Sequence, residues 1–349
     1  MKTFEGSHVL VVGGAGFIGS NLVKKLLREC SIIRITIVDN LLSADRCNIP
    51  DDDRVCFIEG SIANDQVLQI LEDNIDYVFH LATFHGNQNS IFAPLQDHEN
   101  NTLTTLKLFE RLKDFCRLKK VVYSSAGCSV AKKTFDTAEA TKELETVSLN
   151  MDSPYSMSKI FGEFYSKYYF KQHQLPVVRV RFQNVYGPGE VLGAGQWRGT
   201  IATIWRNVIP TFIYKSLDRQ ALPLENGGYA SRDFIYVDDI VMGLICAALR
   251  GAVGDVYNLA SGKETTILEL ATLINQLTNN DVPCQILPKR AWDTSGRRFG
   301  CTRKSEEVLG FKTKISMDEG LRHTVEWTKQ NLYLIDSAIN QHKTRTLIN

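Results

Sequence analysis

The sequence predicts an α/β protein in which a doubly wound parallel sheet is followed by a smaller C-terminal α/β lobe. Short apolar runs alternate with helix-length amphipathic segments through the first half, which is the pattern of right-handed βαβ units. This alternation ends near residue 190, where a glycine-rich stretch begins. The 349 residues are enough for two such parts.

Six apolar runs are expected to form strands of the sheet: residues 8–12, 33–38, 54–58, 76–80, 120–124 and 176–182. Helical periodicity falls between them, at residues 21–27, 64–73, 101–118 and 155–172. Further along, an apolar helix is expected over residues 240–249, with Asp238 or Asp239 as its N-cap.

The alternation also suggests domain boundaries. We expect residues 1–187 to form the sheet-containing domain and residues 188–332 to form mainly the second lobe, with the segment 233–260 returning to the first domain. Residues 333–349 show weak periodicity and are expected to form a C-terminal tail that frays.

Composition limits the class of protein. The net charge of +1 gives no reason to expect a nucleic-acid or membrane partner. The eight cysteines are scattered without a Cys-x-x-Cys pair, so we expect reduced thiols, no disulfide framework and no metal site. We expect no signal peptide before the first strand, and no apolar run reaches the ~20 residues of a membrane span. We therefore expect a cytoplasmic protein.

A glycine-rich turn at residues 13–19 joins the first apolar run to the first helical segment. A buried strand, such a turn and a helix N-terminus together hold a pyrophosphate in Rossmann-type folds. Asp39 ends the second strand 20 residues after Gly19, where an acid suits a ribose 2′-hydroxyl and repels a 2′-phosphate. The pattern predicts NAD rather than NADP, although the same turn also occurs without a ligand.

Tyr155 and Lys159 stand four residues apart, on one face of a predicted helix that Pro154 begins. A free phenol with a pKa near ~10 is a poor base at neutral pH. An adjacent ammonium and a positive nicotinamide ring would lower that pKa, and a shift of ~2–3 units corresponds to roughly 3–4 kcal/mol. The pair is therefore a candidate acid/base centre, although this spacing is also common on plain helix surfaces.

Taken in order, these motifs resemble those of extended short-chain dehydrogenase/reductases, specifically the nucleotide-sugar epimerase/dehydratase family with its UDP-glucose 4-epimerase-like members. The similarity covers about residues 7–330. The motifs that carry it are residues 13–19, Asp39 with Asn40, His80-Leu81-Ala82, Asn101, Tyr155 with Lys159, residues 181–189 and residues 232–239.

The resemblance implies an NAD site. Its residues would be Gly13, Gly16, Phe17, Ile18, Gly19, Asp39, Asn40, Ser61, Ile62, Leu81, Ala82, Asn101, Ser124, Tyr155 and Lys159. Ser61 is a departure, because family members usually carry Asp before this isoleucine; a serine still forms hydrogen bonds with adenine.

The resemblance also implies a nucleotide-sugar site. Asn184 and Arg232 fall where the family grips the substrate diphosphate, and Arg290 with Asp293 resembles a later pair at the diphosphate and the nucleotide ribose. Arginine donates bidentate hydrogen bonds to phosphate, and a carboxylate accepts from ribose hydroxyls. The alternatives are a surface ion pair of Arg232 with Asp233 or Asp239, and a loop cap for Asp293.

The catalytic serine or threonine of the family has more than one candidate in this sequence. Ser125 is our candidate as the hydrogen-bonding partner of Tyr155, but an ungapped alignment puts Ala126 at this position. Cys128 and Ser129 are the remaining candidates.

The implied reaction is 4-epimerisation of a nucleotide sugar through a transient 4-keto sugar, with Tyr155 as acid/base. No acid lies between Ser124 and Lys132, which disfavours the 4,6-dehydratases with their Thr-Asp-Glu motif. The alternatives are a dehydrogenase, a decarboxylase or an atypical dehydratase, and more distantly a non-catalytic NAD-binding scaffold.

Family resemblance of the helices near residues 101–118 and 155–172 implies a homodimer. Four further residues remain open between sugar contact and packing: Trp197, Arg198, Arg297 and Arg298.

Overall fold

The computed structural model describes residues 4–127, 130–131, 134–145, 151–290 and 296–346. Its centre is a seven-stranded sheet in the order β12-β7-β5-β4-β1-β2-β3, and every neighbouring pair is parallel. The strands are β1 (His8–Val12), β2 (Arg34–Asp39), β3 (Val55–Glu59), β4 (Tyr77–His80), β5 (Lys120–Ala126), β7 (Val177–Phe182) and β12 (Val256–Leu259).

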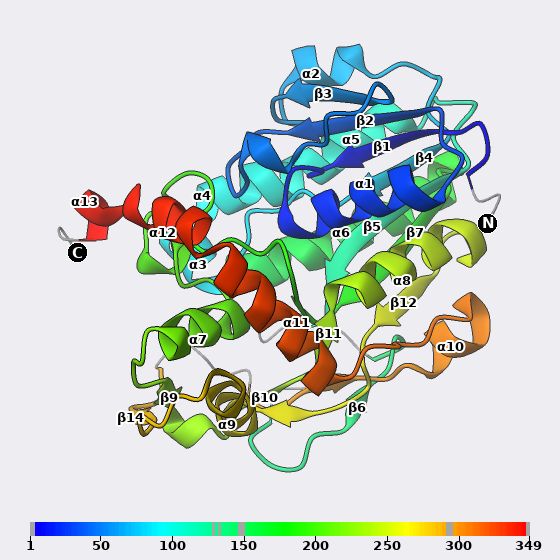
Figure 1. Cartoon of the computed structure of the whole chain (residues 1–349). Helices are drawn as coiled ribbons and strands as arrows, with labels where there is room; N and C mark the ends of the chain where they lie inside the picture. Colours follow the sequence, from blue (N-terminus) through cyan, green and yellow to red (C-terminus); the bar gives the residue numbers. More distant parts are fainter. Residues whose placement is uncertain (1–3, 128–129, 132–133, 146–150, 291–295, 347–349) are drawn as a thin grey trace.

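The chain winds outward from β1 through β2 to β3 and then returns to the other side of β1 through β4, β5 and β7 (Figure 1). This is the predicted doubly wound, Rossmann-type sheet. Its switch point lies between β1 and β4, and ligands of such sheets bind outside the carboxyl ends of the strands there. All six predicted strands are present, and β12 from the segment 233–260 adds a seventh.

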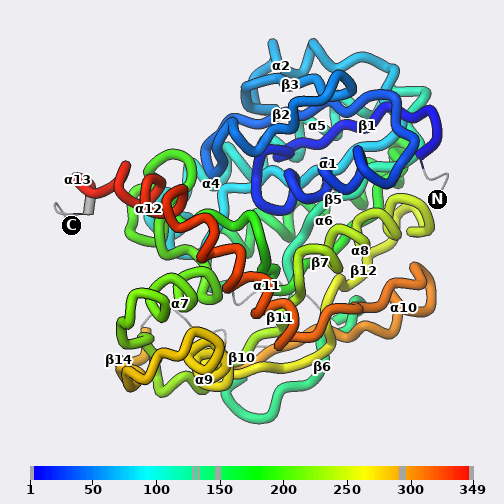
Figure 2. The backbone as a smooth tube through the Cα atoms, viewed as in Figure 1, coloured from blue at the N-terminus to red at the C-terminus, as the bar shows by residue number. Residues whose placement is uncertain are grey.

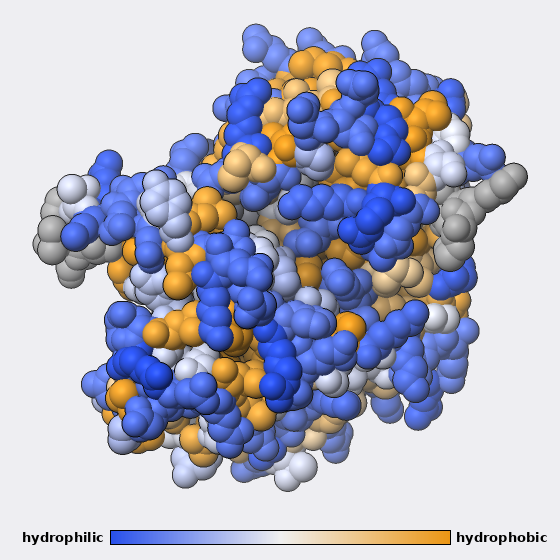
Figure 3. Space-filling model, in the orientation of Figure 1, coloured by the Kyte–Doolittle hydropathy of each residue, from blue (hydrophilic) through white to orange (hydrophobic). Residues whose placement is uncertain are grey.

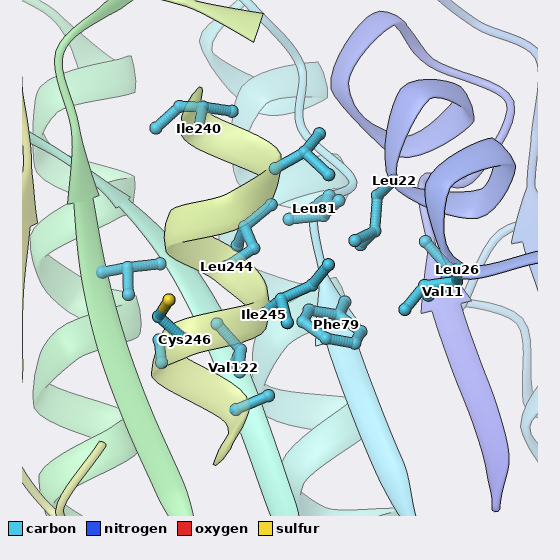
Figure 4. Packing of buried hydrophobic residues seen from close by; sticks show 14 of the residues in the cluster. Val11, Leu22, Leu26, Phe79, Leu81, Val122, Ile240, Leu244, Ile245 and Cys246 are labelled. Atoms are coloured by element: carbon cyan, nitrogen blue, oxygen red, sulfur yellow. The ribbon is translucent and has the colours of Figure 1, made fainter. Parts of the chain in front are cut away.

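Helices cover both faces of the sheet because the strand side chains alternate between two apolar clusters. Val9 and Val11 pack with α1 (Phe17–Glu29) and α8 (Val237–Arg250). Leu10 and Val12 pack on the other face with α2 (Asp65–Ile70), α5 (Thr104–Leu112) and α6 (Pro154–His173). Figure 4 shows Leu244 and Ile245 of α8 over Phe79 and Val122 of the sheet.

The predicted N-cap of the apolar helix is wrong. Helix α8 already begins at Val237, so Asp238 and Asp239 lie in its first turn, where the helix dipole favours acids. The carboxylate of Asp239 instead accepts backbone hydrogen bonds from Lys314 at 3.0 Å and Ile315 at 3.1 Å. It thus fastens a distant segment of the chain to α8.

The smaller lobe is built around α7 (Val208–Leu217), α9 (Ile267–Thr278) and α11 (Met317–Gln330), which share an apolar cluster. Figures 1 and 2 show these segments gathered below the sheet. Short strand pairs edge the lobe: β8 (Asn184–Tyr186) with β11 (Phe234–Tyr236), β9 (Pro223–Glu225) with β14 (Gln285–Leu287), and β10 (Ser231–Arg232) with β13 (Thr265–Thr266).

A segment from the first half of the chain also joins the lobe. Strand β6 (Ala140–Thr141) pairs with β15 (Phe299–Gly300), which precedes α10 (Arg303–Leu309). The Asn258 amide donates to the Thr141 carbonyl at 2.9 Å and to the Cys301 carbonyl at 3.2 Å. This asparagine therefore ties β12 to β6 and to the residue that follows β15.

The expectation that the C-terminal tail frays is wrong for residues 333–340. They belong to α12 (Leu332–Asn340), in which Ile335 and Ala338 are buried. Both side chains pack against Val191 and Leu192. Their spacing of three residues puts them on one helix face, a pattern too short to stand out in the sequence. A last turn, α13 (Lys343–Thr346), follows.

The surface in Figure 3 mixes hydrophilic and hydrophobic residues. Among the described residues, the helices are all too short or too polar to cross a membrane.

The packing of α8 predicts the cost of a cavity. Leu244→Ala removes a side chain with 0% exposure and is expected to lower the free energy of unfolding by about 2–5 kcal/mol. Leu268→Ala, at a position with 44% exposure, is the matched control and is expected to change it by about 0.5 kcal/mol or less. Urea unfolding followed by circular dichroism measures both. Equal losses in the two variants would contradict this assignment of the core.

Candidate active site

The glycine turn lies at the carboxyl end of β1, beside the loop that follows β4. Gly13 has φ +86°, and a Cβ there would lie 2.5 Å from the backbone nitrogen of Ala82. A Cβ on Gly19 would overlap the carbonyl oxygen of Gly13. Both positions therefore exclude side chains, and the backbone of the turn stays open toward the start of α1.

Asp39 ends β2 next to this turn. Its carboxylate accepts hydrogen bonds from the backbone of Ala15 at 3.0 Å and of Leu41 at 2.9 Å. Burial raises the pKa of Asp39, whereas these N–H donors favour its charged form. The side chain thus holds the glycine turn in place and also lines the pocket beside it.

A pocket of about 440 Å³ runs from the glycine turn to the smaller lobe. Nearly all of the described site residues that the sequence predicts line it. They are Gly13, Gly16, Phe17, Ile18, Gly19, Asp39, Asn40, Ser61, Ile62, Leu81, Ala82, Ser124, Ser125, Tyr155, Lys159, Asn184, Arg232 and Arg290.

Helix α6 brings the tyrosine and the lysine to this pocket. Ser153 caps the helix by accepting a hydrogen bond from the backbone of Ser156, and Pro154 occupies the first turn. The buried ammonium of Lys159 donates to the Ser124 carbonyl at 3.1 Å and lies 5.9 Å from the ring centroid of Tyr155. The predicted pair therefore shares one helix face and one pocket.

The serines at the end of β5 donate to protein acceptors. Ser124 Oγ donates to the His80 carbonyl at 2.8 Å, and Ser125 Oγ donates to Glu163 Oε1 at 2.6 Å. Burial disfavours the charge of Glu163, but the Arg181 guanidinium, bonded at 2.8 and 2.9 Å, holds the pKa of that carboxyl below its usual value. Ala126 also lines the pocket, whereas Cys128 and Ser129 fall outside the described residues.

Asn101 does not line the pocket, although the sequence motif suggested a cofactor contact. It lies in a π-helical turn, His98–Leu103, a deviation that often marks functional regions. Its side chain accepts from the backbone of Phe84 at 2.8 Å and donates to Asp97 at 2.7 Å. It therefore fixes the loop after β4.

The far end of the pocket is cationic. Arg232 donates to the Gly296 carbonyl at 2.6 Å, and Arg290 pairs with Glu225. A second hollow of about 430 Å³ shares both arginines and continues along the start of α7. Asp233 and Asp239 are the two acids suggested as ion-pair partners of Arg232. The carboxylate of Asp233 accepts a hydrogen bond from the backbone of Ser261, and that of Asp239 accepts one from the backbone of Lys314. Asp293 lies outside the described residues.

Two of the open loop residues contribute to packing. Trp197 packs against His342, with ring centroids 5.7 Å apart, and Arg198 is buried with its guanidinium bonded to Ser43 at 2.5 Å. Among the other two, Arg297 pairs with Glu264 at 2.8 Å, while Arg298 lines the pocket.

The pocket residues that sequence reasoning missed include three titratable ones, His85, Glu190 and Arg206. Burial raises the pKa of Glu190 to about 7, and Asn207 donates to its carboxylate. Arg206 donates to the Val191 carbonyl at 2.8 Å. The only available signal was position, because His85 follows the quoted His80-Leu81-Ala82 motif and Glu190 follows residues 181–189. Among the described residues no cluster suits a metal ion.

Comparison with known proteins identifies the family. The profile of the NAD dependent epimerase/dehydratase family matches residues 9–260. The enzyme WbmF of Bordetella bronchiseptica, solved in complex with NAD+ and UDP, is 58% identical, with 99% of each chain covered and a TM-score of 0.89.

Two curated relatives are more distant. A putative UDP-glucose 4-epimerase of Methanocaldococcus jannaschii is 28% identical over 324 residues, which cover 93% of this chain and 99% of that protein. The trifunctional UDP-glucose 4,6-dehydratase/UDP-4-keto-6-deoxy-D-glucose 3,5-epimerase/UDP-4-keto-L-rhamnose-reductase RHM2 of Arabidopsis thaliana is 25% identical over 94% of this chain, which spans only 48% of that enzyme. The predicted fold and NAD dependence are confirmed, and the chain belongs to the NAD-dependent epimerase/dehydratase family.

Proposed function

We propose that the protein is a nucleotide-sugar 4-epimerase that works through a transient 4-keto sugar. The observation that carries this proposal is one pocket shared by the glycine turn, by Tyr155 with Lys159, and by Arg232 with Arg290. The UDP bound by WbmF supports a UDP-sugar as the substrate. The 4-epimerase named among the relatives supports the reaction.

NAD+ held at the glycine turn supplies an acceptor that takes a hydride from the sugar and returns it. Tyr155 as phenolate takes the proton of the C4 hydroxyl, so that C4 becomes a carbonyl. Lys159 stabilises the phenolate by its positive charge. After the 4-keto sugar turns, C4 receives the hydride on its other face and Tyr155 returns the proton to the oxygen. No atom is gained or lost.

The nucleotide is held away from the reacting carbon. Arg232 and Arg290 would neutralise the diphosphate, and Asn184 with the N-terminal end of α7 lies in the same wall of the pocket. Binding energy at this end orients the sugar without opposing its rotation. Asp293 stays a predicted contact to the nucleotide ribose. In this assignment residues 1–187 bind NAD and residues 188–332 mainly bind the nucleotide sugar.

A dehydratase is the second candidate, because RHM2 carries that activity in its name. Removal of the C6 hydroxyl needs proton transfer at C5 and C6, yet the segment from Ser125 to Ala131 contains no acid. Dehydrogenation would release reduced cofactor, and decarboxylation would lose carbon dioxide. A scaffold that only binds NAD would have no need of the Tyr155 and Lys159 pair.

A homodimer is the proposed assembly. Helix α6 exposes four large apolar side chains on one side: Met157, Phe161, Phe164 and Tyr168, with exposures of 45–52%. Three more lie in the short helices α3 (Asn87–Phe92) and α4 (Pro94–Asp97), namely Ile91, Phe92 and Leu95. Exposed apolar patches of this kind mark protein interfaces.

Removal of the phenol tests the reaction. Tyr155→Phe is expected to lower kcat by about 10²–10⁴-fold, because the acid/base group is lost while the ring remains. Proton NMR of UDP-hexoses detects the C4 epimer, and mass spectrometry confirms an unchanged mass. Tyr333→Phe, at a position with 90% exposure, is the control. A product of different mass, or net formation of NADH by the unmodified protein, would contradict epimerisation.

The acid at the end of β2 predicts cofactor preference. Asp39→Asn is expected to weaken NAD+ binding about tenfold, or about 1.4 kcal/mol. It should also reduce the difference between the affinities for NAD+ and NADP+, because the charge that repels a 2′-phosphate is lost. Calorimetric titration of cofactor-free protein with both dinucleotides measures this. Asp53→Asn changes an exposed acid and is the control. An unaltered ratio of the two affinities would contradict the role of Asp39.

The apolar side of α6 predicts the oligomeric state. Phe164→Asp is expected to convert a dimer to monomers, since it places a charge in the centre of the apolar surface. Size-exclusion chromatography with light scattering reads the mass. Ile286→Asp, at a position with 66% exposure in β14, is the control. A monomeric unmodified protein would rule the dimer out.

A further inference from the structure

We propose that His85 is a catalytic residue, which donates a hydrogen bond from its neutral imidazole to the oxygen on the reacting carbon of the sugar. This assignment rests on the proposed 4-epimerase reaction and adds a residue to it. The imidazole would supply the donor that the hydroxyl groups at the end of β5 direct elsewhere.

The position of His85 is well fixed. It lies in the loop after β4, next to Phe84. The backbone N–H of Phe84 donates to the Asn101 side chain at 2.8 Å, and the Asn101 amide donates to the Phe84 carbonyl at 3.3 Å. The Asn89 amide donates to the His85 carbonyl at 3.4 Å. The backbone that carries His85 is thus held from two helices.

The imidazole lies beside the proposed acid/base. Its ring centroid is 6.0 Å from that of Tyr155, with the planes at 69°, and both residues line the pocket. His85 keeps part of its surface exposed there. A sugar oxygen that binds the Tyr155 hydroxyl would therefore also lie near the imidazole of His85.

The donors of β5 are already engaged. The protons of Ser124 and Ser125 point to the His80 carbonyl and to Glu163, and the Glu163 carboxylate is itself fixed by Arg181. Ala126 has no hydroxyl. An oxygen on the reacting carbon consequently needs a hydrogen-bond donor from another element. The loop after β4 also lines the pocket and supplies His85.

The charge state of the imidazole suits this role. Burial lowers the pKa of His85 to about 3, and the positive charges of Arg206, Arg198 and Lys159 act in the same direction. A neutral imidazole has one donor and one acceptor nitrogen. A neutral donor polarises a carbonyl without having to lose a proton, as in enzymes that use an uncharged histidine as electrophile.

A purely structural role is the competing interpretation, because an edge-to-face contact with Tyr155 would also orient the phenol. Two variants separate these roles. His85→Phe keeps an aromatic ring but has no N–H, whereas His85→Gln keeps a donor but has no ring. Hydrogen-bond donation predicts that the first is impaired and the second is largely rescued; packing predicts the reverse order.

The first measurement is the rate at which bound NAD+ is reduced after mixing with UDP-glucose or UDP-galactose, followed at 340 nm. His85→Phe is expected to be about 10²-fold slower, and His85→Gln to lie within about 10-fold of the unmodified protein. NAD content and affinity for UDP should not change. His323→Phe, an exposed histidine of α11, is the control. A rate for His85→Phe equal to that of the unmodified protein, or equal losses in both variants, would overturn the proposal.

The second measurement does not depend on turnover. In the holoenzyme with ¹⁵N-labelled histidine, UDP-glucose is expected to shift the ring nitrogens of His85, whereas UDP alone is not. The ring should show the neutral form at pH 6. Equal shifts with both ligands, or a protonated ring, would overturn the role of His85. A protein that converts none of the UDP-hexoses but passes this NMR test would refute the 4-epimerase assignment and leave the sugar contact standing.

Discussion

The buried contact between α6 and the end of β5 is the constraint on which the pocket depends. The buried ammonium of Lys159 donates a hydrogen bond to the Ser124 carbonyl. One turn later, the carboxylate of Glu163 accepts hydrogen bonds from Arg181 of β7 and from the hydroxyl of Ser125. Leaving one charge of such a buried pair without its partner typically costs about 3–5 kcal/mol. Helix α6 therefore has one stable setting against the sheet, and the orientation of Tyr155 follows from it.

The sheet order explains why the two ends of the pocket meet. The chain reverses its direction of travel between β1 and β4, so the glycine turn and the loop after β4 face each other across the switch point. The pairing of β8 with β11 then directs the chain from β7 into the smaller lobe. As a result, Arg232 and Arg290 line the same pocket as Tyr155 of α6.

Much of the sheet could be predicted, and nearly all of the described residues predicted for the site line the pocket, because their signals are local. Apolar runs indicate strands. A Cβ cannot be accommodated at Gly13 or Gly19, so the turn requires glycines that can be recognised in the sequence. The errors concern residues whose partners are distant in the sequence. Asp239 binds a segment 75 residues further on, and α12 packs against Val191. His85 gave no signal of its own, since only folding brings it beside Tyr155.

Strand β6 has a consequence for how the protein is made. It leaves the first half of the chain, yet its partner β15 and the asparagine that joins them to the sheet are synthesised much later. On the ribosome, the segment around Thr141 must wait without its neighbours until Gly300 has emerged. A nascent chain that stops before Arg298 has its glycine turn but lacks this residue of the pocket lining. The lining of the pocket is therefore completed late in synthesis.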